Sequence, residues 1–189
     1  MSAKEPIIYL DLDGVCTNLI GAAIELHGEN PREILNKWEE EFPGEFNAYK
    51  VMGMEKDEFW EIIHDNGVGF WARLDEYPWF KELYRELSKI ADVFFLSAPT
   101  YSGASLAGKL KWLQDRFNKE FQDYVFTSHK YHLAHPNSIL IDDYDRNVDL
   151  FREQGGSGIL FPQFWNDNYH IKNKLEYTLN KVKKWHKNL

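Results

Sequence analysis

Short runs of apolar residues recur along the chain, and many of their side chains are β-branched or aromatic. The strands of a parallel sheet are covered on both faces, so they read as near-continuous apolar runs of this kind. We therefore predict a set of short, buried strands over residues 7–10, 93–96, 124–126, 138–141 and 158–161.

In the second half of the chain, the segments between these runs carry apolar residues at helical spacing. The spacing predicts helices over 80–90, 106–117 and 171–182, and a shorter helix over 145–154 that ends at a pair of glycines. Strands that alternate with helices form crossover units, which join parallel strands. The chain is therefore predicted to be an α/β protein with a parallel sheet flanked by helices.

Residues 17–78 break this alternation because they contain no convincing strand. Helical patterns fall around 21–27, 31–41 and 56–64, and Pro78 is expected to begin the helix that returns to the sheet. We predict a catalytic core of residues 1–16 and 79–189, with 17–78 inserted as a helical cap. The cap is dense in large rings, and we expect its interior to hold Trp38, Phe42, Phe59 and Trp60.

Charge and composition narrow the functional classes. The 189 residues include 22 basic and 30 acidic side chains, for a net charge of −8, which disfavours nucleic-acid and anionic-membrane partners. The single cysteine excludes an internal disulfide and favours a reducing compartment. The first residues do not resemble a signal peptide, and no apolar run approaches the length of a bilayer span. We therefore expect a cytoplasmic protein.

Polar side chains that can do chemistry follow four of the predicted strands. Because the carboxyl ends of parallel strands meet at one edge of a sheet, where ligands bind, these side chains should converge. They are Asp11 and Asp13 after the first strand, Ser97 after the second, Lys130 after the third, and Asp142 and Asp143 after the fourth.

Clustered carboxylates repel one another in a cleft unless a cation or a proton is also present. Oxygen ligands of this kind suit Mg²⁺, and a lysine with a serine hydroxyl beside the ion suits a phosphoryl group. Asp11 could then attack phosphorus as a nucleophile. Asp13 would protonate the leaving oxygen and later act as base for water.

These residues resemble the four ordered motifs of the haloacid dehalogenase (HAD) superfamily. The carrying motifs are Asp11-Leu12-Asp13-Gly14-Val15, Ser97, Lys130 and Asp142-Asp143. An aspartate two residues after the nucleophile is typical of that superfamily's phosphatases. The resemblance implies a HAD-type, Rossmann-like sheet with a small helical cap inserted after the first strand.

The sequence is more closely similar to the 5'(3')-deoxyribonucleotidase family. The similarity lies in segments 93–99, 111–113, 127–130, 140–145 and, at the junction of cap and core, 69–74. It implies a phosphomonoesterase for (deoxy)ribonucleoside 5'-monophosphates that works through an aspartyl-phosphate.

The resemblance also implies roles for individual residues. Asp11 would be the nucleophile and Asp13 the acid and base. Ser97 and Lys130 would bind phosphate. Mg²⁺ would be held by Asp11, the Asp13 carbonyl and Asp142.

For substrate contacts we expect Phe70 or Trp71 to touch the base or sugar, because both lie at the junction of cap and core; His64 is a weaker candidate. Two departures from the family put base and sugar selectivity in question. Ala98 stands where the family usually has a second hydroxyl, and Leu19 stands where the animal enzymes have an aromatic residue.

Several residues have competing interpretations. Lys109 competes with Lys130 for the phosphate site, and we expect Lys109 to be a surface residue, although its position also allows it to reach the rim of the site. Asp143 could serve as a helix cap, as a ligand, or as both. The spacing of His129, His132 and His135 allows a zinc site, although no cysteine accompanies them. Cys16 is expected to be a buried apolar residue.

Two other functions remain open at this point. The enzyme could instead hydrolyse or transfer the phosphate of sugar phosphates, since the motifs do not separate these substrates. Alternatively, the chain could be a non-catalytic nucleotide-binding module, although its complete set of carboxylates argues against this. A polynucleotide 3'-phosphatase is a more remote option, and a homodimer is compatible with the sequence.

Overall fold

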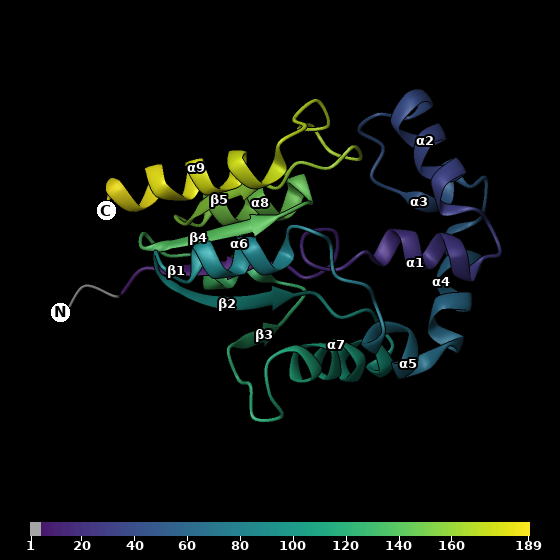
Figure 1. The fold of residues 1–189 in the computed structure, drawn as a ribbon, viewed down its shortest axis with the longest axis horizontal. Coiled ribbons are helices and arrows are strands. Elements are labelled where there is room, and N and C mark those ends of the chain that lie inside the picture. The colour runs from purple at the N-terminus through teal and green to yellow at the C-terminus, as the bar shows by residue number, and fades with distance from the viewer. Residues whose placement is uncertain (1–4) are drawn as a thin grey trace.

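The computed structural model describes residues 5–189 and has an all-parallel sheet at its centre (Figure 1). The strand order is β3-β2-β1-β4-β5. The predicted strands are confirmed, with ends that differ by at most one residue. They are β1 (Ile7–Leu10), β2 (Asp92–Ser97), β3 (Tyr124–Phe126), β4 (Ser138–Asp142) and β5 (Ser157–Leu160).

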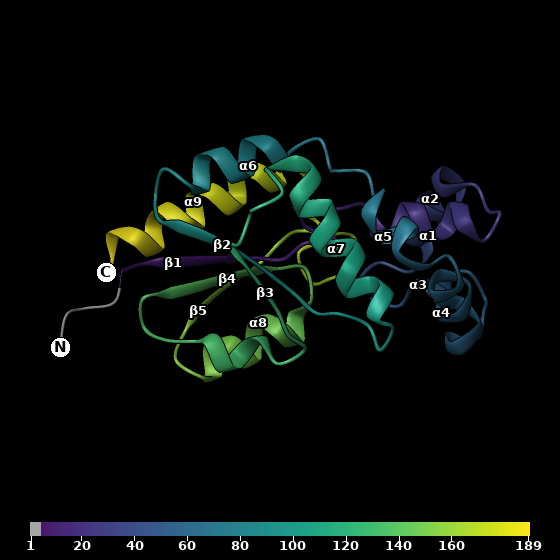
Figure 2. The same ribbon diagram turned by 90° about the horizontal axis from the view of Figure 1, so that it is seen from below.

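Helices cover both faces of the sheet (Figure 2). Ile8, Leu10 and Phe95 point into the larger core cluster, which also holds side chains of α6, α7 and α9. Tyr9 and Leu140 point to the other face, against α8. These helices are α6 (Phe80–Leu87), α7 (Gly103–Arg116), α8 (Asp145–Glu153) and α9 (Lys174–Lys187), and a 3-10 helix, η1 (Lys130–Leu133), follows β3.

The segment between β1 and α6 is helical, as predicted. Its helices lie beyond the carboxyl ends of the strands, on the side of the molecule opposite to the C-terminus (Figure 1). We call these helices the cap. They are α1 (Leu19–Leu26), α2 (Pro31–Glu41), α3 (Ala48–Val51), α4 (Lys56–Asp65) and α5 (Gly67–Ala72). The short helices α3 and α5 were not predicted, because four to six residues are too few to show a period.

The return from the cap differs from the prediction in one detail. Pro78 does not begin the returning helix, because it lies within a turn in which the Phe80 N–H donates to the carbonyl of Tyr77 at 3.0 Å. Helix α6 begins two residues later, at Phe80. The division of the chain at residues 16 and 78 stays a prediction, and residues 1–4 of the predicted core lie outside the described residues. Among residues 5–189, no helix is long and apolar enough to cross a bilayer.

Helix α7 is seated against α5 through Gly108. A β-carbon at this position would lie 2.3 Å from the Cβ of Trp71 and 2.8 Å from the carbonyl oxygen of Val68. Both distances are shorter than van der Waals contact, so only glycine allows this approach. Gly103, the first residue of the same helix, has no atom within 4 Å of such a β-carbon.

We predict that Gly108→Ala lowers the free energy of unfolding by about 1–3 kcal/mol, since it overpacks this contact. Gly103→Ala is the matched control on the same helix. It should leave stability unchanged or raise it by up to about 1 kcal/mol, because alanine has the higher helix propensity. Urea unfolding of both variants measures the difference, and equal stabilities would contradict the close packing of α5 and α7.

Candidate active site

The carboxyl ends of the strands bring the predicted site residues to one cavity. Its volume is about 360 Å³, within the range of small-molecule sites. Asp11 and Asp13 follow β1, Ser97 ends β2, and Lys130 begins η1. The cavity is bordered by all of these and by Asp142 and Asp143. The convergence expected from the sequence is therefore present in the structure.

Lys130 lies between two carboxylates. Its Nζ is 2.9 Å from Oδ1 of Asp11 and 2.6 Å from Oδ2 of Asp142. The exposed fraction is 2% for Lys130, 6% for Asp11 and 0% for Asp142. Charges buried to this degree are stable only when they are paired and hydrogen-bonded, so the three side chains hold one another in place.

Burial dominates the acidity of this group. Removal from water raises the pKa of Asp11 to about 7; Lys130 acts in the opposite direction, and the charges of Asp142 and Asp13 add to the rise. Burial also works against the charge of Lys130, but the attraction of Asp11 and Asp142 outweighs it and raises the pKa of that lysine. Lys130 therefore stays protonated. The neighbouring Asp11 carboxyl group is only partly ionised at neutral pH when no other cation is present.

Lys109 is a second buried lysine of the site, and the expectation that it lies on the surface is wrong. Its exposed fraction is 2%. Its Nζ lies 2.6 Å from Oδ2 of Asp13 and donates to Oγ of Ser97 at 3.0 Å and to the carbonyl of Ala98 at 2.6 Å. Lys109 shares a face of α7 with the buried residues Ser105 and Trp112, and only the packing of the helix reveals that this face is buried.

The two aspartates of β4 have different surroundings. Asp142 accepts hydrogen bonds from Lys130, from the backbone N–H of Tyr144 and from the amide of Asn147. Asp143 accepts one side-chain bond, from Nε1 of Trp165 at 2.7 Å. Burial, followed by the charges of Asp142 and Asp11, raises the pKa of Asp143 well above its usual value.

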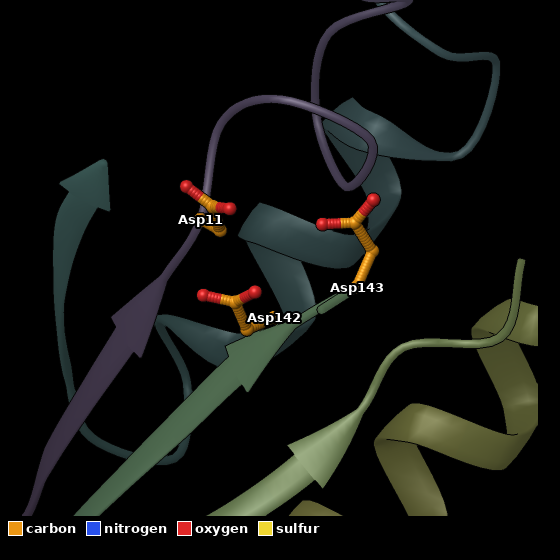
Figure 3. Close-up of side chains that lie close together, drawn as sticks. All are labelled: Asp11, Asp142 and Asp143. Atoms are coloured by element: carbon orange, nitrogen blue, oxygen red, sulfur yellow. The ribbon is translucent and has the colours of Figure 1, made fainter. Parts of the chain in front are cut away.

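Three of these carboxylates can share a metal ion. Asp11, Asp142 and Asp143 each offer an oxygen, and these oxygens lie within 4.8 Å of one another. Figure 3 shows Asp11 and Asp142 with adjacent carboxylates, while Asp143 extends toward the loop after β1. Together with Asp13, the site has four carboxylates against two lysines. Two negative charges therefore remain when all are ionised, and a divalent cation with a preference for oxygen ligands fits this donor set.

The cap supplies most of the apolar wall of the cavity. Its contributions include Leu19, Ile20, Phe46, Tyr49, Phe59, Trp60 and Ile63. From the core, Tyr144 stacks on Phe46 with ring centroids 4.2 Å apart, so this pair joins cap and core at the cavity wall.

Phe70 and Trp71 are both buried, and neither lines this cavity. The Trp71 ring instead packs below Lys109, whose Nζ is 5.2 Å from the ring centroid. Of the rings expected in the cap interior, Trp38 and Phe59 are buried, Trp60 is partly buried, and Phe42 is 36% exposed. Aromatic spacing alone could not separate these positions, because the same rings at the same spacing serve as core, wall and surface.

The remaining candidates lie outside this cluster. His129 and His132 have ring centroids 5.9 Å apart, but among residues 5–189 the group that could share a metal ion is the aspartate cluster, not the three histidines. His64 contacts Oγ1 of Thr100 at 3.1 Å and does not line the main cavity. Cys16 is fully buried, as expected, and its Sγ donates to the carbonyl of Asp11 at 3.1 Å.

Comparison with solved structures shows the fold of this chain. A HAD-like hydrolase from Burkholderia xenovorans is 13% identical, with a TM-score of 0.54 over 96% of this chain and 99% of that one. A HAD-like hydrolase from Streptococcus pneumoniae is 17% identical, with a TM-score of 0.54 over 94% and 98%. A magnesium-bound HAD hydrolase from Bacillus subtilis is 12% identical, with a TM-score of 0.52 over 95% and 99%.

Comparison of sequences shows the family to which the chain belongs. A candidate 5'(3')-deoxyribonucleotidase from Staphylococcus epidermidis is 26% identical over 164 residues, which cover 86% of each chain. The family model of the 5' nucleotidase, deoxy (pyrimidine), cytosolic type C proteins matches residues 5–187. The chain therefore belongs to this family and is a 5'-nucleotidase-like phosphoric monoester hydrolase with a HAD fold.

Proposed function

We propose that the enzyme hydrolyses (deoxy)ribonucleoside 5'-monophosphates to nucleoside and phosphate, with Mg²⁺ and through an aspartyl-phosphate on Asp11. The observation that carries the proposal is that both aspartates expected to react line one aromatic cavity and each contacts a buried lysine. Lys130 pairs with Asp11, and Lys109 pairs with Asp13.

Asp11 is the nucleophile in this proposal. Its Oδ1 accepts from Lys130 and from the backbone N–H of Leu12 at 2.8 Å, so we assign the attack on phosphorus to Oδ2. The bond between phosphorus and the ester oxygen breaks as the new bond forms. Lys130 is placed to neutralise charge on the transferred phosphoryl group, and the hydroxyl of Ser97 is placed to bind one of its oxygens.

Asp13 is the general acid and general base in this proposal. It donates a proton to the leaving ester oxygen, and it then accepts one from the water that attacks the aspartyl-phosphate and releases inorganic phosphate. Lys109 lies 2.6 Å from Oδ2 of Asp13 and holds this side chain at the wall of the cavity. The hydroxyl of Thr17 donates to the other oxygen of Asp13 at 3.1 Å, which fixes the orientation of the group.

Asp11 and Asp143 are the side chains that we propose to hold Mg²⁺. Asp142 completes the acidic cluster, but its oxygens already accept bonds from Lys130, Tyr144 and Asn147. The Asp13 carbonyl stays a predicted ligand. When bound, the ion would offset the repulsion between Asp11 and a phosphate dianion.

The aromatic wall supports a flat, apolar substrate group. Phe46, Tyr49 and Trp60 come from the cap and line the same cavity as the reacting carboxylates. A nucleobase can stack on such rings while its 5'-phosphate reaches Asp11. We therefore assign base contact to these rings rather than to Phe70 or Trp71. Closure of the cap over the substrate would keep bulk water from the aspartyl-phosphate.

Phosphate release from a panel of monoesters tests the proposed function. The panel holds deoxyribonucleoside and ribonucleoside 5'-monophosphates, their 3' isomers and several sugar phosphates, each with Mg²⁺ and with EDTA. We predict EDTA-sensitive release with preference for nucleoside 5'-monophosphates. Asp11→Asn should retain the fold and lose at least about a hundredfold in rate, because covalent catalysis is removed. Release from sugar phosphates alone, or from no substrate, would contradict the proposal.

Lys109→Met tests the role of the second lysine. We predict that kcat falls at least about tenfold, because Lys109 holds Asp13 and Ser97 in place and general acid and base catalysis by a positioned group contributes on this scale. Lys111→Met is the matched control on the same helix, because Lys111 is exposed and pairs with Asp115 at 2.9 Å. Its kcat should not change. Equal rates for the two variants in steady-state assays would refute a role for Lys109.

A further inference from the structure

The loop after β5 places three polar side chains in the interior, and none of them belongs to the four motifs of the active site. Gln163, Trp165 and Asn166 have exposed fractions of 2%, 2% and 1%. They lie outside any helix or strand, so their burial is not a by-product of a regular element. Buried polar groups must find partners, and the partners here include Asp143 of the active site and Gly14 in the loop after β1.

Two of these side chains hold Asp143. Nε1 of Trp165 donates to Oδ2 of its carboxylate at 2.7 Å. The side-chain amide of Asn166 donates to the backbone carbonyl of Asp143 at 2.8 Å and to the carbonyl of Phe161 at the same distance. Gln163 donates to the carbonyl of Gly14, in the loop after β1. One loop therefore fixes both the side chain and the backbone of Asp143 and reaches the loop that carries Asp13.

Gly14 also lies close to the Asp143 carboxylate. A β-carbon at Gly14 would lie 2.0 Å from Oδ2 of Asp143. Oδ2 of Asp143 therefore lies close to both the Gly14 backbone and the indole of Trp165. Trp165 supplies the side-chain hydrogen bond that fixes the orientation of this carboxylate.

The cap fixes the other side of the indole. Trp38 of α2 is fully buried, and its ring centroid lies 5.7 Å from that of Trp165 and 5.3 Å from that of Phe164. The N–H of Gly44 also donates to the carbonyl of Phe164 at 2.9 Å. The Trp165 indole thus contacts the cap on one side and the acidic cluster on the other.

We propose that Trp165 is a positioning residue for the cation: its indole N–H holds Asp143 so that a carboxylate oxygen stays within reach of those of Asp11 and Asp142. The inference rests on the proposed function, because it takes Asp143 as a ligand of Mg²⁺. Groups that orient a metal ligand by one hydrogen bond typically change metal affinity by about 10- to 100-fold when they are removed.

Trp165→Phe tests the inference, because it keeps an aromatic ring and removes the N–H. Titration with MgCl₂ in a calorimeter, without substrate, should show Mg²⁺ affinity at least about tenfold weaker than in the wild-type protein. Trp112→Phe is the matched control. Trp112 is equally buried, and its Nε1 donates to the carbonyl of Leu74 at 2.8 Å, away from the carboxylates. Its Mg²⁺ affinity should match that of the wild type.

An NMR measurement on the wild-type protein covers the case in which Trp165→Phe does not fold. The indole N–H resonance of Trp165 should shift on addition of MgCl₂, and that of Trp112 should not. Wild-type affinity in Trp165→Phe, an equal loss in both variants, or an indole resonance of Trp165 that MgCl₂ does not move would overturn the inference. If the wild-type protein itself binds no Mg²⁺, the metal part of the proposed function fails as well, which separates the two failures.

Discussion

Repulsion among buried carboxylates is the constraint around which this active site is built. Asp11, Asp142 and Asp143 offer oxygens within 4.8 Å of one another, in a place from which water is largely excluded. Like charges at such distances are costly in a low-dielectric environment. Burial, and after it the charges of the neighbouring aspartates, raises the pKa of Asp11 and of Asp143. The same crowding makes the site receptive to a divalent cation and to a phosphoryl group.

The scaffold offsets this repulsion from several directions. Lys130 enters from η1 between Asp11 and Asp142, and Lys109 enters from α7 beside Asp13. The position of Lys109 depends on the close packing of α7 against α5, which the missing side chain of Gly108 allows. The loop after β5 contributes uncharged hydrogen-bond donors to Asp143. Elements that lie far apart in the sequence therefore all help to offset the repulsion among these carboxylates.

The sequence could predict what local pattern determines. Buried strands read as apolar runs, and because parallel strands end at one edge, the convergence of Asp11, Ser97, Lys130 and Asp142 followed from topology. Lys109 was misplaced, because a lysine on a helix is usually exposed and its burial depends on the tertiary position of α7. The choice among the cap rings, and the bonds from Trp165 and Asn166, depend on contacts between distant segments that periodicity does not encode.

Thermal unfolding of the wild-type protein, without substrate, tests most directly whether the acidic cluster binds a divalent cation. The midpoint is measured in EDTA and then at increasing MgCl₂, with NaCl added to keep ionic strength constant. A cation that binds the folded site and not the unfolded chain must raise the midpoint as its concentration increases. We predict that the midpoint rises with the logarithm of the Mg²⁺ concentration once this exceeds the dissociation constant, and that Asp11→Asn reduces the rise. A midpoint that does not respond to Mg²⁺ would contradict the claim that the acidic cluster is built for a divalent cation.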